Sequence, residues 1–411
     1  MKLRRRKTQL GVGGTAITPL AKRYVSQVLD SGRLSYGPFL KRFEAGFARL
    51  HNRRFAVSAN SGTSALQVAV HALKELDGWR NGDEVIVPAL TFIASSNVVL
   101  QNNLRPVFVD VDPATYHIDP GKIESAISKR TRAIMPVHLF GVSADMQPII
   151  KIARRRKLRV IEDSCEAMFV RQRGEPVGSQ GDIACFSTYV AHLLTTGVGG
   201  LLTTNDPAIA VKARSLVNHG RDSIYVAMDD DRGKAGAALA EVMAKRFSFV
   251  SVGYSYRLTE LEGALGLAEL KRWRENIRAR QSNAGYLLNG LSAHRRSLQL
   301  PSWPAHSEHA FMMFPIVVSD PTIKKDELTH WLESWNVETR ELMPLLNQPI
   351  YRKLFGNLEP SYPVAAWLRQ NGFYIGCHPG FTRPDLDYII AVFGEFFRQR
   401  GIATRSGGKE V

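Results

Sequence analysis

Residues 159–167 read Arg-Val-Ile-Glu-Asp-Ser-Cys-Glu-Ala, a short apolar run that ends in carboxylates. Such a run is typical of a buried strand whose polar side chains begin where the strand ends. Similar runs recur through about the first 260 residues, with helical patterns between them. We predict strands at 55–59, 84–90, 106–112, 133–139, 159–163, 183–188 and 200–204. Strands that alternate with helices predict an α/β fold, in which a mostly parallel sheet carries helices on both faces in three layers.

The length of 411 residues leaves room for a second domain, because domains commonly run to ~100–200 residues. We expect a large domain at 1–260, with an inserted segment at about 221–250 that is rich in Gly, Ala and Asp. One long helix at 259–291 is predicted to lead into a smaller C-terminal α+β domain at 261–400. A polar, flexible tail is expected at 401–411.

Composition excludes several classes of protein. Hydrophobic residues make up 44% of the chain and charged residues 22%, which is typical of a globular protein and not of a disordered chain or a collagen. No apolar run reaches the ~18 residues of a membrane span, and no apolar stretch follows the basic N-terminus, as a secretory signal requires. The cysteines Cys165, Cys185 and Cys377 are too scattered for a disulfide framework or a zinc site. We therefore expect a cytoplasmic protein with no membrane contact and no metal.

The formal net charge of +16 raises the question of nucleic-acid binding. The densest basic stretches are residues 4–6 and 154–157, and the rest of the charge is dispersed. No zinc-finger spacing, basic leucine zipper or recognition helix is visible. We expect no nucleic-acid partner, and a nucleotide-linked small substrate would also suit a basic protein.

Three segments carry residues suited to chemistry. The first is Asn-Ser-Gly-Thr-Ser at 60–64, between a predicted strand and a predicted helix at 63–76. Glycine lets a ligand approach the backbone, and the free N–H groups at a helix start suit a phosphate. The alternative is a simple helix cap without a ligand.

The second segment places carboxylates at the C-terminal end of the strand at 159–163, where parallel sheets build their sites. A buried carboxylate there needs a cationic or N–H partner, and a protonated pyridine nitrogen would be one. The alternative is an exposed strand-end carboxylate.

The third segment, 185–200, ends a strand in a hydroxyl-rich turn, followed by His192 and a glycine-rich stretch. A lone histidine of this kind is either catalytic or structural.

In their order and spacing these segments resemble the DegT/DnrJ/EryC1/StrS family of sugar aminotransferases. Further matches are Thr-Phe at 91–92, His-Leu-Phe-Gly at 138–141, Asn-His-Gly-Arg at 218–221 and Gly-Tyr-Ser-Tyr-Arg at 253–257. The resemblance covers roughly residues 10–400. It implies the pyridoxal phosphate (PLP)-dependent transferase fold, type I, and a homodimer in which residues 253–257 reach the partner's cofactor site.

The resemblance also implies roles for individual residues. Asp163 would pair with the pyridine nitrogen of the cofactor, and Phe92 would stack on its ring. The cofactor phosphate would lie against Gly62, Thr63 and Ser187. Glu166 stands where the family usually has Gln beside the ring hydroxyl. Arg340 would bind a carboxylate or phosphate of a substrate, unless it forms only a surface ion pair.

His192 is the main departure from the family pattern. Most members have a lysine there that bonds covalently to the cofactor, and imidazole has no primary amine with which to do so. One branch resembles this chain in carrying histidine: the 3-dehydratases of nucleotide-linked 4-keto-6-deoxysugars, which use pyridoxamine phosphate (PMP). Residues 162–167, 338–340 and 374–380 and the inserted segment at 221–250 also resemble that branch. The resemblance implies C3 dehydration with His192 as acid and base, and glutamate as amino donor.

Alternatives to dehydration stay open at the level of sequence. The chain could be an aminotransferase-like member of different chemistry, or a catalytically silent ligand-binding homologue. Val198 in place of the usual Glu, and Ser255 in place of the usual Asn, favour the silent homologue. Retention of Asp163 and Ser187 opposes it. Three scattered cysteines also make an iron–sulfur cluster, as found in part of the dehydratase branch, an unexpected cofactor.

Overall fold

The computed structural model describes residues 3–222, 233–245 and 247–402. Its centre is a seven-stranded sheet, in which β9 runs antiparallel to both of its neighbours and the other pairs are parallel. In spatial order the strands are β1 (Phe55–Ala59), β9 (Gly200–Thr204), β8 (Ile183–Ser187), β5 (Arg159–Asp163), β4 (Thr131–Ile134), β2 (Glu84–Pro88) and β3 (Arg105–Val109). The predicted α/β class with a mostly parallel sheet is confirmed.

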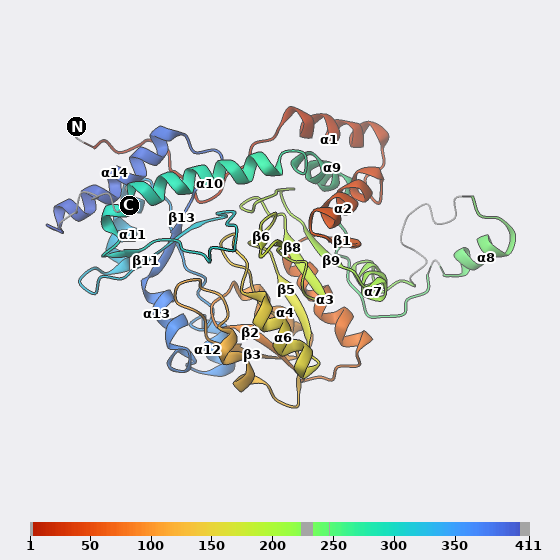
Figure 1. The fold of residues 1–411 in the computed structure, drawn as a ribbon. Helices are drawn as coiled ribbons and strands as arrows, with labels where there is room; N and C mark the ends of the chain where they lie inside the picture. The colour runs from red at the N-terminus through yellow and green to blue at the C-terminus, as the bar shows by residue number, and fades with distance from the viewer. Residues whose placement is uncertain (1–2, 223–232, 246, 403–411) are drawn as a thin grey trace.

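Helices cover both faces of this sheet (Figure 1). Side chains of neighbouring strand residues point to opposite faces, and the cores reflect this alternation. Val85 and Val87 of β2 join the core that contains α3 (Gly62–Leu76), whereas Ile86 joins a separate core with α6 (Met146–Arg156). The sheet is therefore the middle of three layers, as its β-branched strands predict.

The other helices of the described chain lie around this sheet and along the C-terminal part. They are α1 (Pro19–Ser31), α2 (Pro38–Leu50), α4 (Ile93–Gln101), α5 (Pro120–Ile123), α7 (Pro207–Val217), α8 (Gly236–Lys245), α9 (Glu260–Glu269), α10 (Trp273–Gly290), α11 (Lys325–Ser334), α12 (Pro349–Phe355), α13 (Pro363–Asn371) and α14 (Arg383–Gln399). None of the helices in the described ranges has both the length and the apolar character needed to cross a lipid bilayer.

A second sheet lies in the C-terminal part. It is antiparallel, in the order β10 (Leu298–Gln299), β11 (Phe314–Val318), β13 (Gly372–Ile375) and β12 (Arg340–Glu341). Its apolar side chains pack with α10, α11 and α14 in a core of their own, which Leu10 from the N-terminal segment joins. A short hairpin of β6 (Arg171–Gln172) and β7 (Glu175–Pro176) completes the strands. The domain boundaries at residues 260 and 400 stay predictions.

The predicted insertion at 221–250 and the predicted tail at 401–411 fall partly outside the described residues, which leave out 223–232, 246 and 403–411. Of the insertion, α8 is described, and Figure 1 shows it set apart from the body of the fold.

The single helix predicted at 259–291 is wrong, because the structure breaks it into α9 and α10 at residues 270–272. Lys271 and Arg272 each donate a backbone hydrogen bond to the carbonyl three residues earlier, which tightens the turn. Trp273 then starts α10 with its ring stacked on that of Phe169, at a centroid distance of 5.0 Å. This contact joins segments more than a hundred positions apart, so a local helical pattern does not reveal it.

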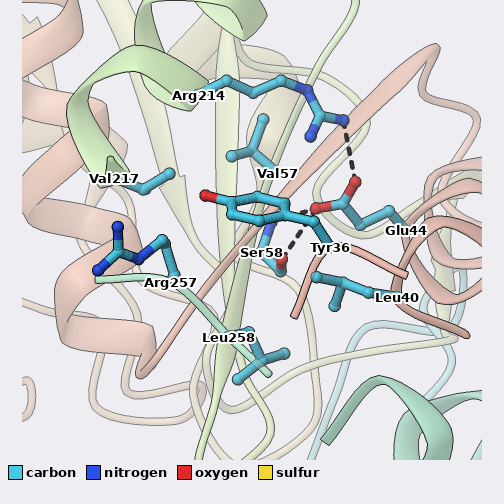
Figure 2. Close-up of a pocket in the computed structure, with 9 residues that line it drawn as sticks. All are labelled: Tyr36, Leu40, Glu44, Val57, Ser58, Arg214, Val217, Arg257 and Leu258. Atoms are coloured by element: carbon cyan, nitrogen blue, oxygen red, sulfur yellow. Dashed lines mark hydrogen bonds and ion pairs between the residues drawn. The ribbon is translucent and has the colours of Figure 1, made fainter. Parts of the chain in front are cut away.

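A buried carboxylate joins three elements of the large sheet's edge (Figure 2). Glu44 of α2 accepts hydrogen bonds from the backbone N–H and the hydroxyl of Ser58 in β1, each at 2.8 Å. Its other oxygen lies 2.9 Å from Nη2 of Arg214 in α7. A cavity of about 20 Å³ beside the pair, also bordered by Tyr36, has room for little more than one water molecule.

Replacement of this carboxylate gives a test of the packing. Glu44→Ala leaves the buried N–H of Ser58 without its acceptor and the guanidinium of Arg214 with only the carbonyl oxygen of Ala56, so we expect a loss of about 2 kcal/mol in stability. Glu44→Gln keeps an acceptor for Ser58 and should lose about half as much. Urea-unfolding midpoints measure both, and a Glu44→Ala protein that unfolds at the wild-type midpoint would contradict this role.

Candidate active site

A cavity of about 400 Å³ lies at the C-terminal ends of β5 and β8, beside the start of α3. This is the edge where parallel sheets place their ligand sites. Of the residues predicted to form the site, all but Arg340 line this cavity: Gly62, Thr63, Phe92, Asp163, Glu166, Ser187 and His192. We call it the main cavity.

Gly62 sets the distance between α3 and the sheet. A Cβ atom at this position would lie 2.7 Å from Cβ of Ser187 and 2.8 Å from Sγ of Cys165, closer than such atoms approach. Ser61 caps the helix by accepting a hydrogen bond from the N–H of Ser64 at 3.0 Å. The N–H groups of Gly62 and Thr63 belong to the first helical turn and have no carbonyl partner within the helix. Two donors at the positive end of a helix dipole thus border the cavity.

Asp163 ends β5 and is 4% exposed. One carboxylate oxygen accepts a hydrogen bond from the hydroxyl of Ser95 at 2.7 Å, and the other accepts from the N–H of Cys165 at 3.2 Å. Within the described part of the chain, no Lys, Arg or His side chain forms an ion pair with it. A buried carboxylate without a cation is costly, and its position on the cavity leaves it available to a cationic ligand atom.

Glu166 is a second buried carboxyl group on the same cavity. One oxygen accepts a hydrogen bond from the N–H of Phe140 at 3.0 Å. Burial raises the pKa of Glu166 to about 7, and the nearby charge of Asp163 acts in the same direction, against the opposing effect of the Phe140 hydrogen bond. Near neutral pH this group can therefore donate a hydrogen bond as well as accept one.

His192 follows β8 in a turn and is half-buried. Its Nδ1 lies 3.1 Å from the backbone carbonyl oxygen of Ser187. A carbonyl only accepts, so Nδ1 carries the proton and Nε2 keeps a free lone pair. Burial lowers the pKa of His192 to about 4, opposed by the Ser187 hydrogen bond and reinforced by the charge of Arg280. The imidazole is therefore neutral at physiological pH.

Other residues in and behind the wall of the main cavity escape the sequence analysis. Ser95 links Asp163 to Thr91, whose hydroxyl oxygen lies 2.8 Å from that of Ser95. Tyr374 borders the cavity from the second sheet, and Met312, Met313 and Met343 add apolar wall. Tyr374 falls within a segment that resembles the dehydratase branch, but nothing in its local pattern marks it as a cavity residue. Ser95 lies behind the cavity wall, and no local pattern predicts its contact with Asp163.

Phe92 precedes α4 and is 59% exposed, so one large apolar ring faces open space at the rim of the cavity.

Arg340 does not line the main cavity. It lies on β12 opposite Tyr374 in the register, is itself exposed, and pairs with Glu338. The surface ion pair that the sequence left open as an alternative is thus present.

Two further departures from the family pattern, Val198 and Ser255, lie on the surface. Val198 is 52% exposed. Ser255 is exposed and accepts a hydrogen bond from Arg257 at 2.8 Å.

Burial raises the pKa of each thiol, Cys165, Cys185 and Cys377, so none is poised as a nucleophile. Across the described ranges, no group of three or more His, Cys, Asp or Glu side chains is arranged to hold a metal ion.

Comparison with known proteins identifies relatives along nearly the whole chain. The profile of the DegT/DnrJ/EryC1/StrS aminotransferase family matches residues 16–393. The GDP-perosamine synthase of Caulobacter vibrioides is 36% identical over 375 residues, which cover 90% of this chain and 94% of the relative. The dTDP-4-dehydro-2,6-dideoxy-D-glucose 3-dehydratase of Saccharopolyspora spinosa is 32% identical over 376 residues, covering 89% and 81% of the two chains.

Solved structures give the same picture of the fold. A GDP-4-keto-6-deoxymannose-3-dehydratase, crystallised with PLP and glutamate trapped together, superimposes with a TM-score of 0.83 at 26% identity. The match covers 93% of this chain and 99% of that one. These neighbours are PLP-dependent enzymes of fold type I, which confirms the predicted fold and cofactor class.

The close approach at Gly62 generates a prediction. Gly62→Ala should push the start of α3 away from β8 and lower the affinity for PLP by about tenfold, because the first-turn N–H groups no longer face the cavity squarely. Gly285→Ala in α10 is the matched control, since a Cβ there meets no atom within 4 Å. Equilibrium titration with PLP, followed by absorbance, measures both variants. Unchanged affinity in Gly62→Ala would show that the cofactor does not rest on this helix start.

Proposed function

The chain belongs to the DegT/DnrJ/EryC1/StrS aminotransferase family of PLP-dependent enzymes, and from this we propose that it removes the C3 hydroxyl group from a nucleotide-linked 4-keto-6-deoxysugar. The observation that carries the proposal is His192, whose imidazole stands where most members have a cofactor-bonding lysine. A histidine on the main cavity can move protons but cannot tether a cofactor. The relatives named as 3-dehydratases support the same reaction class.

The residues on the main cavity fit PLP or PMP. Asp163, buried and without a cation, suits a protonated pyridine nitrogen, and the exposed ring of Phe92 suits a stacked aromatic group. The helix start at Gly62 and Thr63, with the Ser187 hydroxyl, suits a phosphate. When bound, PMP supplies an amine for the C4 ketone of the sugar and a ring that withdraws electrons.

His192 is assigned the proton transfers. Its Nδ1–H is held by the Ser187 carbonyl, so Nε2 is the atom that takes the proton removed during the reaction. The imidazolium can then deliver that proton to the C3 hydroxyl, which leaves as water. The low pKa of His192 favours this delivery and opposes the preceding uptake, because it makes the imidazolium a strong acid and the imidazole a weak base.

Glu166 is assigned the ring hydroxyl of the cofactor. Its pKa of about 7 places a protonated carboxyl beside Asp163 at the lower end of the neutral range. Only one of the two neighbouring carboxyl groups then carries a negative charge, so the two groups do not repel each other.

Three further parts of the proposal concern partners. Glutamate is the amino donor that restores PMP, and the dehydratase structure with trapped glutamate supports it. Arg340 pairs in the sheet register with Tyr374, which lines the cavity. It binds substrate only if its ion pair with Glu338 opens. Residues 253–257 complete the site of a second copy in a homodimer.

Aminotransfer is the second candidate. The Caulobacter synthase is more similar to this chain than the Saccharopolyspora dehydratase is, and its name denotes synthesis of an amino sugar. The chemical difference lies at C3, where the hydroxyl is either expelled or retained.

Substitutions at His192 test the proposal. His192→Asn keeps hydrogen-bonding capacity but is no base at neutral pH, so single-turnover dehydration should fall by ~10²–10⁴-fold. Borohydride should leave PLP unattached to residue 192 in the wild type. His192→Lys should regain covalent attachment, seen by peptide mass spectrometry. Full dehydratase activity in His192→Asn would transfer the base to another residue and overturn the assignment.

The pKa of Glu166 generates a pH prediction. As pH rises through about 7, the carboxyl group of Glu166 ionises and loses the O–H that donates to the cofactor. The affinity of the wild-type protein for PLP should therefore decrease over this interval. The amide of Glu166→Gln donates at every pH, and its affinity should change less over the same interval. Fluorescence titration with PLP between pH 6 and about 8 compares the two. Parallel pH profiles would refute the role of Glu166.

A further inference from the structure

A second cavity, of about 230 Å³, shares His192 with the main cavity. Its walls come from residues 14–16, the start of α10 and residues 378–380. We call it the Arg280 pocket, after the α10 residue whose charge dominates it.

Arg280 is 3% exposed and has no carboxylate partner within the described part of the chain. Nη1 donates to the carbonyl oxygens of Phe311 and Met312 at 3.2 and 2.8 Å, and Nε has no hydrogen-bond partner there. Burial lowers the pKa of this guanidinium, although the group stays charged at neutral pH. A buried positive charge without an anion is unfavourable, and a bound anion would relieve it.

The one carboxylate on the pocket wall is already engaged. Glu269 accepts a hydrogen bond from Asn276 at 3.2 Å, and Nη1 of Arg272 lies 3.9 Å from its other oxygen. Glu269 therefore balances Arg272, while the charge of Arg280 remains unbalanced. The net character of the pocket is cationic.

The N-terminal segment closes the pocket tightly. A Cβ atom at Gly14 would lie 2.8 Å from Cε1 of His378, and one at Gly13 would lie 3.1 Å from Cα of Ala191. The backbone of this segment thus packs directly against the loops on either side. The Arg280 pocket is consequently a formed cavity with a fixed wall.

Size and position restrict the ligand. Pockets for drug-sized molecules span about 300–1,000 Å³, so 230 Å³ suits a smaller group. His192 borders both cavities, so a ligand whose anionic group lies in the Arg280 pocket can place a reacting atom at the main cavity. In such a ligand only a few bonds separate the anionic group from the reacting atom. An amino acid meets this condition, whereas the diphosphate of a nucleotide sugar is separated from C4 by the sugar ring.

We propose that the Arg280 pocket binds a carboxylate of the dicarboxylic amino donor, with Arg280 as its counter-ion. The inference rests on the proposed function, since it places the donor of that reaction. In the donor half-reaction glutamate and PLP become 2-oxoglutarate and PMP, so no other oxidant or reductant is needed.

The test uses glutarate, a dicarboxylate that has no amine and cannot react, titrated calorimetrically into the PLP-loaded protein. Ala16 lines the pocket from an exposed position, where substitution should not disturb folding. Ala16→Asp adds a like charge and should weaken glutarate binding on the order of tenfold, while the neutral Ala16→Asn should bind nearly as the wild type does. Equal affinities for the two variants would overturn the proposal.

Arg280→Gln should raise the dissociation constant of glutarate at least tenfold, with a thermal melt to verify folding. If that variant does not fold, the Ala16 pair still decides. GDP that displaces glutarate competitively would assign the pocket to the nucleotide and overturn the proposal. The titration needs no sugar, so failure to dehydrate a sugar contradicts only the proposed function, and failure to bind glutarate in a charge-dependent way contradicts only this inference.

Discussion

The carboxylate of Asp163 is the constraint on which the site depends. It is buried at the end of β5, accepts from Ser95 and Cys165, and has no ion-pair partner within the described residues. Desolvation of such a charge has to be offset by something that the chain itself does not provide there. In the proposed function a protonated pyridine ring meets this need. The helix start at Gly62 lies at one side and the ring of Phe92 at the rim.

The absence of lysine at residue 192 changes what the remaining groups must do. A lysine would bond covalently to PLP between reactions, whereas in the proposed function the affinity comes from the helix start, the buried carboxylate and stacking. The same substitution frees Nε2 of His192 from any bond, because the Ser187 carbonyl fixes the proton on Nδ1. In the proposed function, weak retention of the cofactor and a free base are thus two consequences of one side chain.

Much of the fold follows from sequence because short β-branched runs report buried strands directly. The predicted strand at 159–163 coincides with β5, and the helix predicted at 63–76 differs from α3 by one residue. Asp163, Ser187 and Gly62 meet because strand ends converge at one edge of a parallel sheet. Long-range contacts have no such local signal. The break before Trp273 depends on stacking against Phe169, and the Arg280 pocket joins segments that look ordinary one by one. The family pattern predicts a substrate role for Arg340, but it does not reveal the exposure of this side chain or its pair with Glu338, two residues earlier.

The proposed function depends on His192 directing this family member toward loss of the C3 hydroxyl. Mass spectrometry of the products is the most direct measurement, with purified protein, PMP, glutamate and a panel of nucleotide-linked 4-keto-6-deoxysugars. We expect a product formed by loss of the C3 hydroxyl, a 3-deoxy-4-keto sugar, with 2-oxoglutarate formed alongside. A product that retains the C3 hydroxyl and carries an amino group at C4 would contradict it.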